Sequence, residues 1–430
     1  MRPYRIAALV IGLAMAAAVA ALVGGVGSAA DSQWALLGSQ VPGSVDRPVW
    51  SIAASPAHPA VLLEATQGRG VLRSVDGGST WASVISSGDA AWVVRFDPQQ
   101  AGLAYAGTQT EGLWRSADEG KTWSRVLSAP DPDLRAIDVA PGLVLVGTAH
   151  GAFSSTDGGV TWQSLGLQNL DVSAVAIVAS GTTNTLFAGA DNGTSGGYLL
   201  TASGTTGSWA IVHGGFPGDA TVAALAAGPA PAGSTGHSIF AGTSQGLYRS
   251  DDTGATWSQV AGLPQSDVNL VAVNPASGDQ VYAASDGDQG QGGVFRSLDH
   301  GATWSPLATA GLPKRPRVTA LALQAGSAMQ VLAATWNPTS SEVGLYRVAD
   351  PSAAVAGSPA ALPSSTARAT SRPTAQPRAS SPAERSGSGL ELGAAWRNVG
   401  IGAVLIALLC AVFVFRRWRM RREDLQTYRR

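Results

Sequence analysis

The 430-residue chain has little cysteine, little lysine and little charge of either sign. Its one cysteine, Cys410, lies in an apolar run near the C-terminus, which excludes an intramolecular disulfide framework and a cysteine-based zinc cluster. Lysine occurs only twice, and charged residues make up 13% of the chain. This low charge, combined with 53 glycines, is typical of a turn-rich all-β protein. The 13 tryptophans exclude a disordered main body.

The net charge of −1 conceals an uneven distribution. Residues 31–350 carry 25 acidic and 14 basic side chains, which gives this body a net charge of −11. Residues 351–390 have a net charge of +3, and the chain after Phe415 has a net charge of +5. Because phosphate binding requires a basic face, the acidic body argues against nucleic acid as a partner.

The first 30 residues are typical of an export signal. The basic segment MRPYR precedes an apolar run over 6–26, and the small residues at 27–30 suit a cleavage site. An uncleaved anchor is the alternative, because an apolar run of this length just spans a bilayer. We expect residues 1–30 to be a signal peptide.

A second apolar run, at 399–415, predicts one transmembrane helix over 395–416. Trp396 and Trp418 flank this run, and five arginines follow within 416–422. The positive-inside rule therefore places the Arg-rich tail, 417–430, in the cytoplasm. Residues 351–394 are rich in Ala, Ser and Pro and have too few large apolar side chains to fold, which predicts a disordered stalk. The sequence thus predicts a single-pass protein of the cell membrane with its body outside.

One octapeptide, S-x-D-x-G-x-T-W, occurs five times in the body. The complete copies begin at residues 74, 116, 155, 250 and 297, and a decayed copy at 201–209 keeps Trp209 but lacks the Asp. Successive tryptophans are 42, 39, 47, 48 and 47 residues apart, which matches the length of a four-stranded propeller blade. The sequence therefore predicts an all-β fold in which residues 31–350 form a seven-bladed β-propeller.

Four short strands with their own turn signals are expected in each repeat. The seven first strands are expected to begin near Val49, Ala91, Arg135, Val172, Thr221, Val268 and Val318. The last repeat has no octapeptide and so lacks a fourth strand. The N-terminal segment 33–37, headed by Trp34, resembles the other fourth strands and is expected to close the seventh blade.

The octapeptide has a mechanical explanation. Its Asp can accept hydrogen bonds from its own turn, its Gly tolerates positive φ, and its Trp buries a large ring against the sheet. Near-identical copies at blade spacing indicate architecture rather than chemistry. We therefore assign structural roles to Asp76, Trp81, Asp118, Trp123, Asp157, Trp162, Asp252, Trp257, Asp299 and Trp304.

The octapeptide resembles the Asp-box, or BNR repeat. This repeat is found in sialidases, sortilin-type receptors, xyloglucanase-like glycoside hydrolases and photosystem II assembly-factor propellers. The resemblance covers about residues 34–348 and is specific for the fold but not for the function. In those families the box lies between the third and fourth strands, away from the active face. The resemblance thus implies that the box residues are not catalytic.

Ligands are expected at the opposite edge, which we call the rim. It carries the loops between second and third strands and the loops that link successive blades. The candidate binding residues there are Arg69, Glu111, His150, Asp191, Asn192, Gln245, Asp286, Asp288 and Trp336. The alternative for each of them is an ordinary polar loop residue, which is the more common role of such a residue.

Specific chemistries find little support in the sequence. The arginines that a sialidase would need occur at one repeat-equivalent position on separate blades: Arg73, Arg115, Arg249, Arg296 and Arg347. A glycosidase pair drawn from carboxylates such as Asp97, Asp138 and Asp191 stays open. The five histidines have no short spacing, and 286–293 lacks the pattern of a calcium loop. No phosphate-binding or dinucleotide motif is present in the sequence, so no metal or cofactor is expected.

These observations predict a membrane-anchored, extracytoplasmic propeller that acts as a scaffold and binds a protein or a glycan. No catalytic residue is assigned. The alternative is a cell-surface glycoside hydrolase, sialidase-like or xyloglucanase-like, that acts on extracellular polysaccharide. An assembly factor is a third interpretation. The photosystem assembly-factor propellers carry a basic patch, which the net charge of −11 on this body puts in doubt.

Overall fold

The structure, a computed structural model, describes residues 33–38 and 48–351. Short gaps in this range fall at 87, 89, 127–130, 181–182, 194–195, 206, 230–235, 264–266, 286–291, 309, 315, 327 and 338. The predicted signal peptide, stalk, transmembrane helix and cytoplasmic tail lie outside the described residues. Within them, the structure contains no helix of the length and apolar character needed to cross a membrane.

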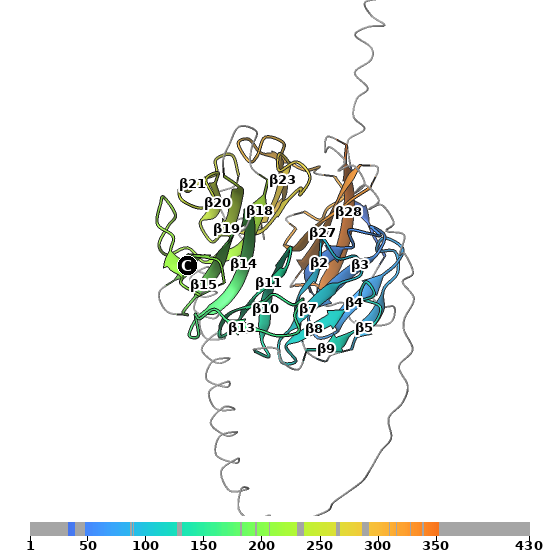
Figure 1. Cartoon of the computed structure of the whole chain (residues 1–430). Helices are drawn as coiled ribbons and strands as arrows, with labels where there is room; N and C mark the ends of the chain where they lie inside the picture. The colour runs from blue at the N-terminus through green and yellow to red at the C-terminus, as the bar shows by residue number, and fades with distance from the viewer. Residues whose placement is uncertain are drawn as a thin grey trace, which may run out of the picture. The chain divides into compact units, whose positions relative to one another are not determined.

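Over the described residues, twenty-eight strands form seven four-stranded antiparallel sheets (Figure 1). The first strands are β2 (Val49–Ala54), β6 (Ala91–Phe96), β10 (Leu134–Ala140), β14 (Asp171–Ser180), β18 (Val222–Gly228), β22 (Val268–Val273) and β26 (Val318–Gln324). The second strands are β3 (Leu62–Thr66), β7 (Ala104–Thr108), β11 (Leu143–Thr148), β15 (Thr183–Asp191), β19 (Ser238–Thr243), β23 (Val281–Ser285) and β27 (Met329–Asn337). All seven first strands begin within one residue of the predicted positions.

The third and fourth strands form the outer half of each blade and together have fewer residues than the first and second strands. The third strands are β4 (Gly70–Ser74), β8 (Leu113–Ser116), β12 (Gly151–Ser155), β16 (Gly197–Ser203), β20 (Gly246–Ser250), β24 (Gly293–Ser297) and β28 (Glu342–Asp350). The fourth strands are β5 (Ala82–Ile85), β9 (Ser124–Arg125), β13 (Gln163–Ser164), β17 (Ala210–Ile211), β21 (Ser258–Gln259), β25 (Ser305–Pro306) and β1 (Ala35–Leu36). The prediction of a seven-bladed, all-β propeller is confirmed.

The seven blades form a ring. Each first strand lies beside the first strands of the two neighbouring blades, and β2 of blade 1 lies beside β26 of blade 7. In Figure 1 the blue strands of blade 1 accordingly lie next to the orange strands β27 and β28. Because each blade is covered on both faces, the second strands are buried almost without interruption, as in the BBBBB pattern of β3, β7 and β23.

Seven hydrophobic clusters fill the seven spaces between blades, and each contains one tryptophan from the start of a fourth strand. These residues are Trp34, Trp81, Trp123, Trp162, Trp209, Trp257 and Trp304. Trp209, from the decayed octapeptide, has the same packing role as the others. The indole of Trp209 therefore packs between blades 3 and 4 although its turn lacks the Asp.

The seventh sheet takes its outer strand from the other end of the propeller. β1 pairs with β28, with Ala35 opposite Arg347 and Leu36 opposite Tyr346. Trp34 is 2% exposed, and its Nε1 donates a 3.0 Å hydrogen bond to the carbonyl oxygen of Leu307 in blade 6. Trp34 thus packs between blades 6 and 7 as the other six tryptophans pack between their own pairs of blades.

Each complete octapeptide folds into the same turn between the third and fourth strands. In the first copy, Asp76 Oδ1 accepts a 2.9 Å bond from the Thr80 amide, and Asp76 Oδ2 accepts a 2.7 Å bond from the Thr80 hydroxyl. Ser74 Oγ accepts from the Gly78 amide, and Trp81 Nε1 donates to the Gly78 carbonyl. The Thr80 hydrogen bonds lower the pKa of Asp76 to about 2. The carboxylate therefore acts as a fixed acceptor of the turn.

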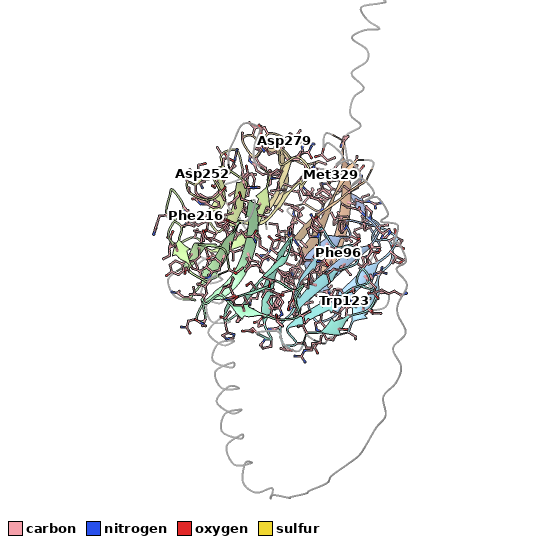
Figure 2. The ribbon with its side chains drawn as sticks, viewed as in Figure 1. Phe96, Trp123, Phe216, Asp252, Asp279 and Met329 are labelled. Carbon is pink, nitrogen blue, oxygen red and sulfur yellow. The ribbon has the colours of Figure 1, made fainter. Side chains whose placement is uncertain are left out.

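The glycine of this turn also meets the neighbouring blade. Gly254 has φ +88°, and a Cβ at this position would lie 2.6 Å from the Phe187 ring of the previous blade. In Figure 2, Asp252 of the same octapeptide lies near the outer margin of the ring. The octapeptide is thus a joint between blades as well as a turn, and we call the edge that carries it the box edge.

Candidate functional site

Every first strand contains a β-bulge near its start, at the second residue of six strands and at the third residue of β14. A bulge inserts one residue and redirects its side chain, and bulges are frequent beside binding sites. Here the preceding residue is buried in every blade, whereas the bulge residue is partly or fully exposed. The bulge residues are Trp50, Trp92, Arg135, Ser173, Ala223, Asn269 and Thr319.

These seven residues surround the centre of the ring at the rim, and we call them the mouth. The bulge residues of blades 1, 2 and 3 lie close to one another. The Trp50 and Trp92 rings lie 6.0 Å apart at 46°, and the Arg135 guanidinium lies 6.0 Å from the Trp92 ring centroid. The mouth is asymmetric, because blades 1–3 contribute two indoles and a guanidinium, whereas blades 4–7 contribute small side chains.

Carboxylates hold the large side chains of the mouth in place. Asp133 Oδ1 accepts a 3.0 Å hydrogen bond from Trp92 Nε1, and Asp133 Oδ2 lies 2.9 Å from Arg135 NH2. Arg135 NH1 forms a second ion pair, at 2.8 Å, with Asp171 Oδ2 in the next blade. Arg135 is therefore clamped between two carboxylates while it stacks on an indole. This arrangement fixes its orientation without a ligand.

Asp171 is the least satisfied member of this group. Its Oδ1 is buried and has no hydrogen-bond partner among the described residues. Burial raises the pKa of Asp171, and the negative charges of Asp133 and Asp191 act in the same direction, whereas Arg135 opposes them. The raised pKa of Asp171 thus reflects its partial burial, which outweighs the stabilising charge of Arg135.

A histidine–carboxylate pair adjoins the mouth in blade 3. His150 Nδ1 lies 2.8 Å from Asp131 Oδ2, and the Asp131 side chain is buried whereas that of His150 is exposed. Asp131 Oδ1 also accepts a 2.8 Å bond from the Asp133 amide. Asp131 therefore orders the loop that presents Asp133 to the mouth.

The predicted rim residues have different surroundings. His150 and Asp191 lie next to the mouth group, through Asp131 and Asp171 respectively. Gln245 donates a 2.9 Å bond to Asp219, and Asn192 lies 3.4 Å from the Tyr198 hydroxyl. The Glu111 carbonyl accepts a hydrogen bond from the Arg125 side chain, and the Trp336 amide donates one to the Arg317 carbonyl. Both are local contacts within a loop or between neighbouring strands. Asp286 and Asp288 lie outside the described residues.

The main residues of the mouth were missed in the sequence. The sequence assigns no binding role to Trp50, Trp92, Arg135 and Asp171. Asp133 lies in 128–134, one of the blade-linking rim loops at which ligands are expected. A signal existed, because a bulky or polar residue follows the first buried residue in the segments VWSIAA, AWVVRF and LRAIDVA. An inserted residue disturbs the two-residue alternation of a strand and leaves no other mark in a single sequence.

Two of the glycosidase carboxylates considered in the sequence, Asp97 and Asp138, have structural partners of their own. Asp97 accepts bonds from the amides of Gln99 and Gln100, and from the Gln100 side chain, in its own turn at the box edge. Asp138 pairs with Arg95 at 2.7 Å and accepts a 2.8 Å bond from the Ile177 amide. A cavity of about 190 Å³ beside Asp97 also includes Arg115 and the octapeptide residue Asp157. Asp97 and Asp138 are thus both engaged in structural contacts.

Four of the five arginines at the repeat-equivalent position connect blades, whereas Arg249 pairs with Asp251 in its own blade. Arg73 Nε donates to the Glu119 carbonyl at 2.8 Å, and Arg115 Nε donates to the Gly158 carbonyl at 3.0 Å, in each case in the next blade. Arg347 NH1 lies 3.5 Å from the Gly77 carbonyl, across the junction of blades 7 and 1. Arg296 forms a 2.6 Å ion pair with Asp350, which is 0% exposed. These arginines do not converge on a central anion site.

One acidic residue is buried at the junction of blades 7 and 1. Glu64 is 0% exposed, and neither of its carboxylate oxygens has a hydrogen-bond partner among the described residues. The other six second strands have Ala or Val at the equivalent position. Burial raises the pKa of Glu64 to about 8, and the charge of Arg69 opposes this shift. Glu64 is therefore protonated at neutral pH.

No three His, Cys, Asp or Glu side chains are grouped as metal ligands within the part of the chain that the structure describes. The remaining exposed histidine pair, His58 with Glu119 at 2.9 Å, lies at the box edge and joins blades 1 and 2.

Comparisons with known proteins establish the fold. YCF48 from Cyanidioschyzon merolae is 18% identical, with a TM-score of 0.52 over 75% of this chain and 100% of that one. YCF48 bound to D1 peptide matches with a TM-score of 0.50 at 17% identity, over 75% of this chain and 96% of that one. The extracellular domain of a putative one-component system from B. thetaiotaomicron is 10% identical, with a TM-score of 0.53 over 73% of this chain and 39% of that one.

A glycoside hydrolase also appears among the similar structures. The GH74 xyloglucanase from Xanthomonas campestris is 19% identical, with a TM-score of 0.48 over 67% of this chain. The present chain spans only 51% of that enzyme. No protein-family model matches the sequence. No curated protein matches it either. The chain is thus a seven-bladed β-propeller, the fold that these structures share.

Proposed function

We propose that this protein is a membrane-anchored, extracytoplasmic scaffold whose propeller binds a protein or a glycan at the mouth. The five octapeptides are Asp-boxes in this proposal, and the N-terminal strand β1 closes the ring. Residues 1–30 direct export, and residues 395–416 anchor the chain through the stalk 351–394, with the tail 417–430 in the cytoplasm. The candidate rim residues surround the mouth as secondary contacts.

The single observation that carries the proposal is the contact chain Trp50–Trp92–Arg135. The Trp50 and Trp92 ring centroids are 6.0 Å apart, and the Arg135 guanidinium lies 6.0 Å from the Trp92 centroid. These three bulge residues come from three blades, near the starts of their first strands. Partly exposed aromatic and arginine side chains are the residue types most often found at the energetic centre of interfaces. A rigid ring that holds them in place reduces the entropic cost of binding.

A surface glycoside hydrolase is the alternative. Asp133 bonds Trp92, Asp171 lies on the other side of Arg135, and the raised pKa of Asp171 suits a general acid. Both carboxylates are engaged by Arg135, however, which leaves neither of them free to serve as base or nucleophile. The similar structures include both kinds of protein, since YCF48 was determined with a D1 peptide and the Xanthomonas protein is a xyloglucanase.

The distinguishing experiment is a time course with the purified full-length chain in detergent. Cell-wall and extracellular polysaccharide fractions of its own organism are incubated with the protein, and both retained and released sugar are measured. Retention of a protein or glycan, with no release of shorter sugar fragments over hours, supports the scaffold. Time-dependent release that is lost in Asp171→Asn would establish the hydrolase instead.

The proposed topology has a separate test. Protease added to intact cells is expected to remove the propeller and to leave the Arg-rich tail protected. A protected propeller, or a tail cleaved in intact cells, contradicts the proposed orientation.

A further inference from the structure

We infer that the mouth recognises a cationic side chain, the guanidinium or ammonium group of an arginine or lysine in an extended segment of a partner protein. This inference deepens the proposed function and rests on it. It names the chemical class of the ligand and assigns the recognition to Trp50, Trp92 and Asp171.

The mouth already binds one guanidinium of its own. Arg135 lies 6.0 Å from the Trp92 ring and forms ion pairs of 2.9 and 2.8 Å with Asp133 and Asp171. Indoles surrounded by carboxylates are a favourable environment for a cation, because the negative face of the ring and the carboxylates attract positive charge together. Trp50 extends the same aromatic surface into blade 1, with its ring centroid 6.0 Å from that of Trp92.

The carboxylates near the mouth exceed the charge of Arg135. On blades 3 and 4 the described side chains around this guanidinium include four aspartates, Asp131, Asp133, Asp171 and Asp191, together with His150. The Asp171 side chain is 39% exposed, although its unpartnered Oδ1 is buried. A second cation would approach Asp171 from its exposed side, where the charges of Asp133 and Asp191 add to the attraction.

The charge of the whole body favours the same kind of ligand. Residues 31–350 carry a net charge of −11, which steers basic segments toward the propeller and slows the approach of acidic ones. Basic residues of the rim, Arg69, Lys314 and Arg317, lie on blades 1 and 7, away from the aspartates of blades 3 and 4. The ligand cation is therefore directed to the side of the mouth formed by Trp92, Arg135 and Asp171.

The test uses full-length protein in detergent with ¹⁵N-labelled tryptophan, and it follows the indole signals of Trp50 and Trp92, assigned by Trp→Phe substitution. The probes are a synthetic nonapeptide with three arginines spaced by Gly and Ser, and its lysine, citrulline and glutamate counterparts. A neutral xyloglucan oligosaccharide is a fifth probe. Citrulline keeps the shape of arginine but removes its charge.

The arginine and lysine peptides are expected to shift the Trp50 and Trp92 signals. The citrulline peptide should bind roughly 2- to 30-fold more weakly, the range that corresponds to one cation–π contact. Binding should weaken further in 0.5 M salt. The substitution Asp171→Asn should reduce the affinity for the arginine peptide, whereas the control Asp279→Asn should leave it unchanged. Asp279 lies between β22 and β23 at the box edge and is labelled in Figure 2.

Equal affinities for the arginine and citrulline peptides would overturn the inference. Shifts produced by the oligosaccharide or the glutamate peptide, but not by the basic peptides, would also overturn it while leaving binding at the mouth intact. If no probe shifts either indole and native ligand is still captured after Trp50 and Trp92 are replaced by alanine, the proposed function at the mouth fails as well.

Discussion

Arg73 and Glu119 join two neighbouring blades, since the Arg73 Nε donates a 2.8 Å hydrogen bond to the Glu119 carbonyl. The acceptor belongs to the octapeptide turn of blade 2, and the donor directly precedes the octapeptide of blade 1. The same relationship connects Arg115 with Gly158. The octapeptide turn and the arginine that precedes it therefore form contacts between blades as well as the turn within one blade.

Replacing Arg115 by alanine is expected to lower the free energy of unfolding by about 1–2 kcal/mol, because the Gly158 carbonyl loses a charged donor. Urea denaturation followed by tryptophan fluorescence measures this change. Lys314→Ala is the control, since Lys314 is exposed and a surface substitution of this kind costs less than about 0.5 kcal/mol. Equal stabilities of the two variants would mean that the arginine does not connect the blades.

Trp34 is expected to be essential to the ring although it lies in a strand of two residues. Trp34→Ala removes a ring that is 2% exposed and packs between blades 6 and 7, and we expect a cost of about 3–5 kcal/mol. Leu36→Ala, in the same strand, is the matched control because Leu36 is 66% exposed. If Trp34→Ala unfolds at the same urea concentration as the control, β1 does not close the propeller.

Glu64 makes the stability of the propeller fall as the pH rises. Burial raises its pKa from 4.5 to about 8, so the folded state keeps a proton that the unfolded state releases. The stabilising contribution is complete below about pH 4.5 and is lost as the pH rises through about 8. In Glu64→Gln, the decline in the free energy of unfolding between pH 5 and 8 should be smaller by more than about 1 kcal/mol. Parallel pH profiles for wild type, Glu64→Gln and the rim control Glu111→Gln would contradict this account.

The octapeptide carboxylates affect stability in the opposite direction from Glu64, because their contribution is lost as the pH falls. Hydrogen bonds from Thr80 lower the pKa of Asp76 to about 2, so its stabilising contribution is present above about pH 4 and is lost as the pH falls toward 2. Thr80→Val removes the hydroxyl donor, and the pKa of Asp76 measured by carboxyl NMR should then move upward toward 3.8. An unchanged pKa would show that the Thr80 hydroxyl does not hold the carboxylate.

Much of the fold is determined by patterns that a single sequence displays. The tryptophan spacing and the seven apolar first strands gave the blade number and the strand starts to within one residue, because both depend on short-range periodicity. The contacts of Arg115 and the burial of Glu64 could not be predicted in this way. Both depend on which surfaces of neighbouring blades meet, and the sequence of one blade does not contain that information.

The mouth was less predictable than the fold for a related reason. Trp50 and Trp92 are 42 residues apart, and their contact requires two bulges that turn both indoles toward the centre of the ring. Loop composition directed attention to the rim, and it identified His150 and Asp191 beside the mouth. It did not identify the first-strand residues, because no residue type marks a bulge position in the sequence.

The central claim is that this propeller acts by binding at the mouth. Its most direct test is capture from native membranes and cell-wall fragments by three forms of the tagged full-length chain: wild type, Trp50→Ala/Trp92→Ala, and the box-edge control Val160→Ala/Leu298→Ala, which alters two exposed side chains. Bound material is quantified by mass spectrometry and sugar analysis. The account predicts one reproducible ligand that the wild type and the box-edge control retain and that the mouth variant loses at least tenfold. Equal capture by all three forms would contradict it.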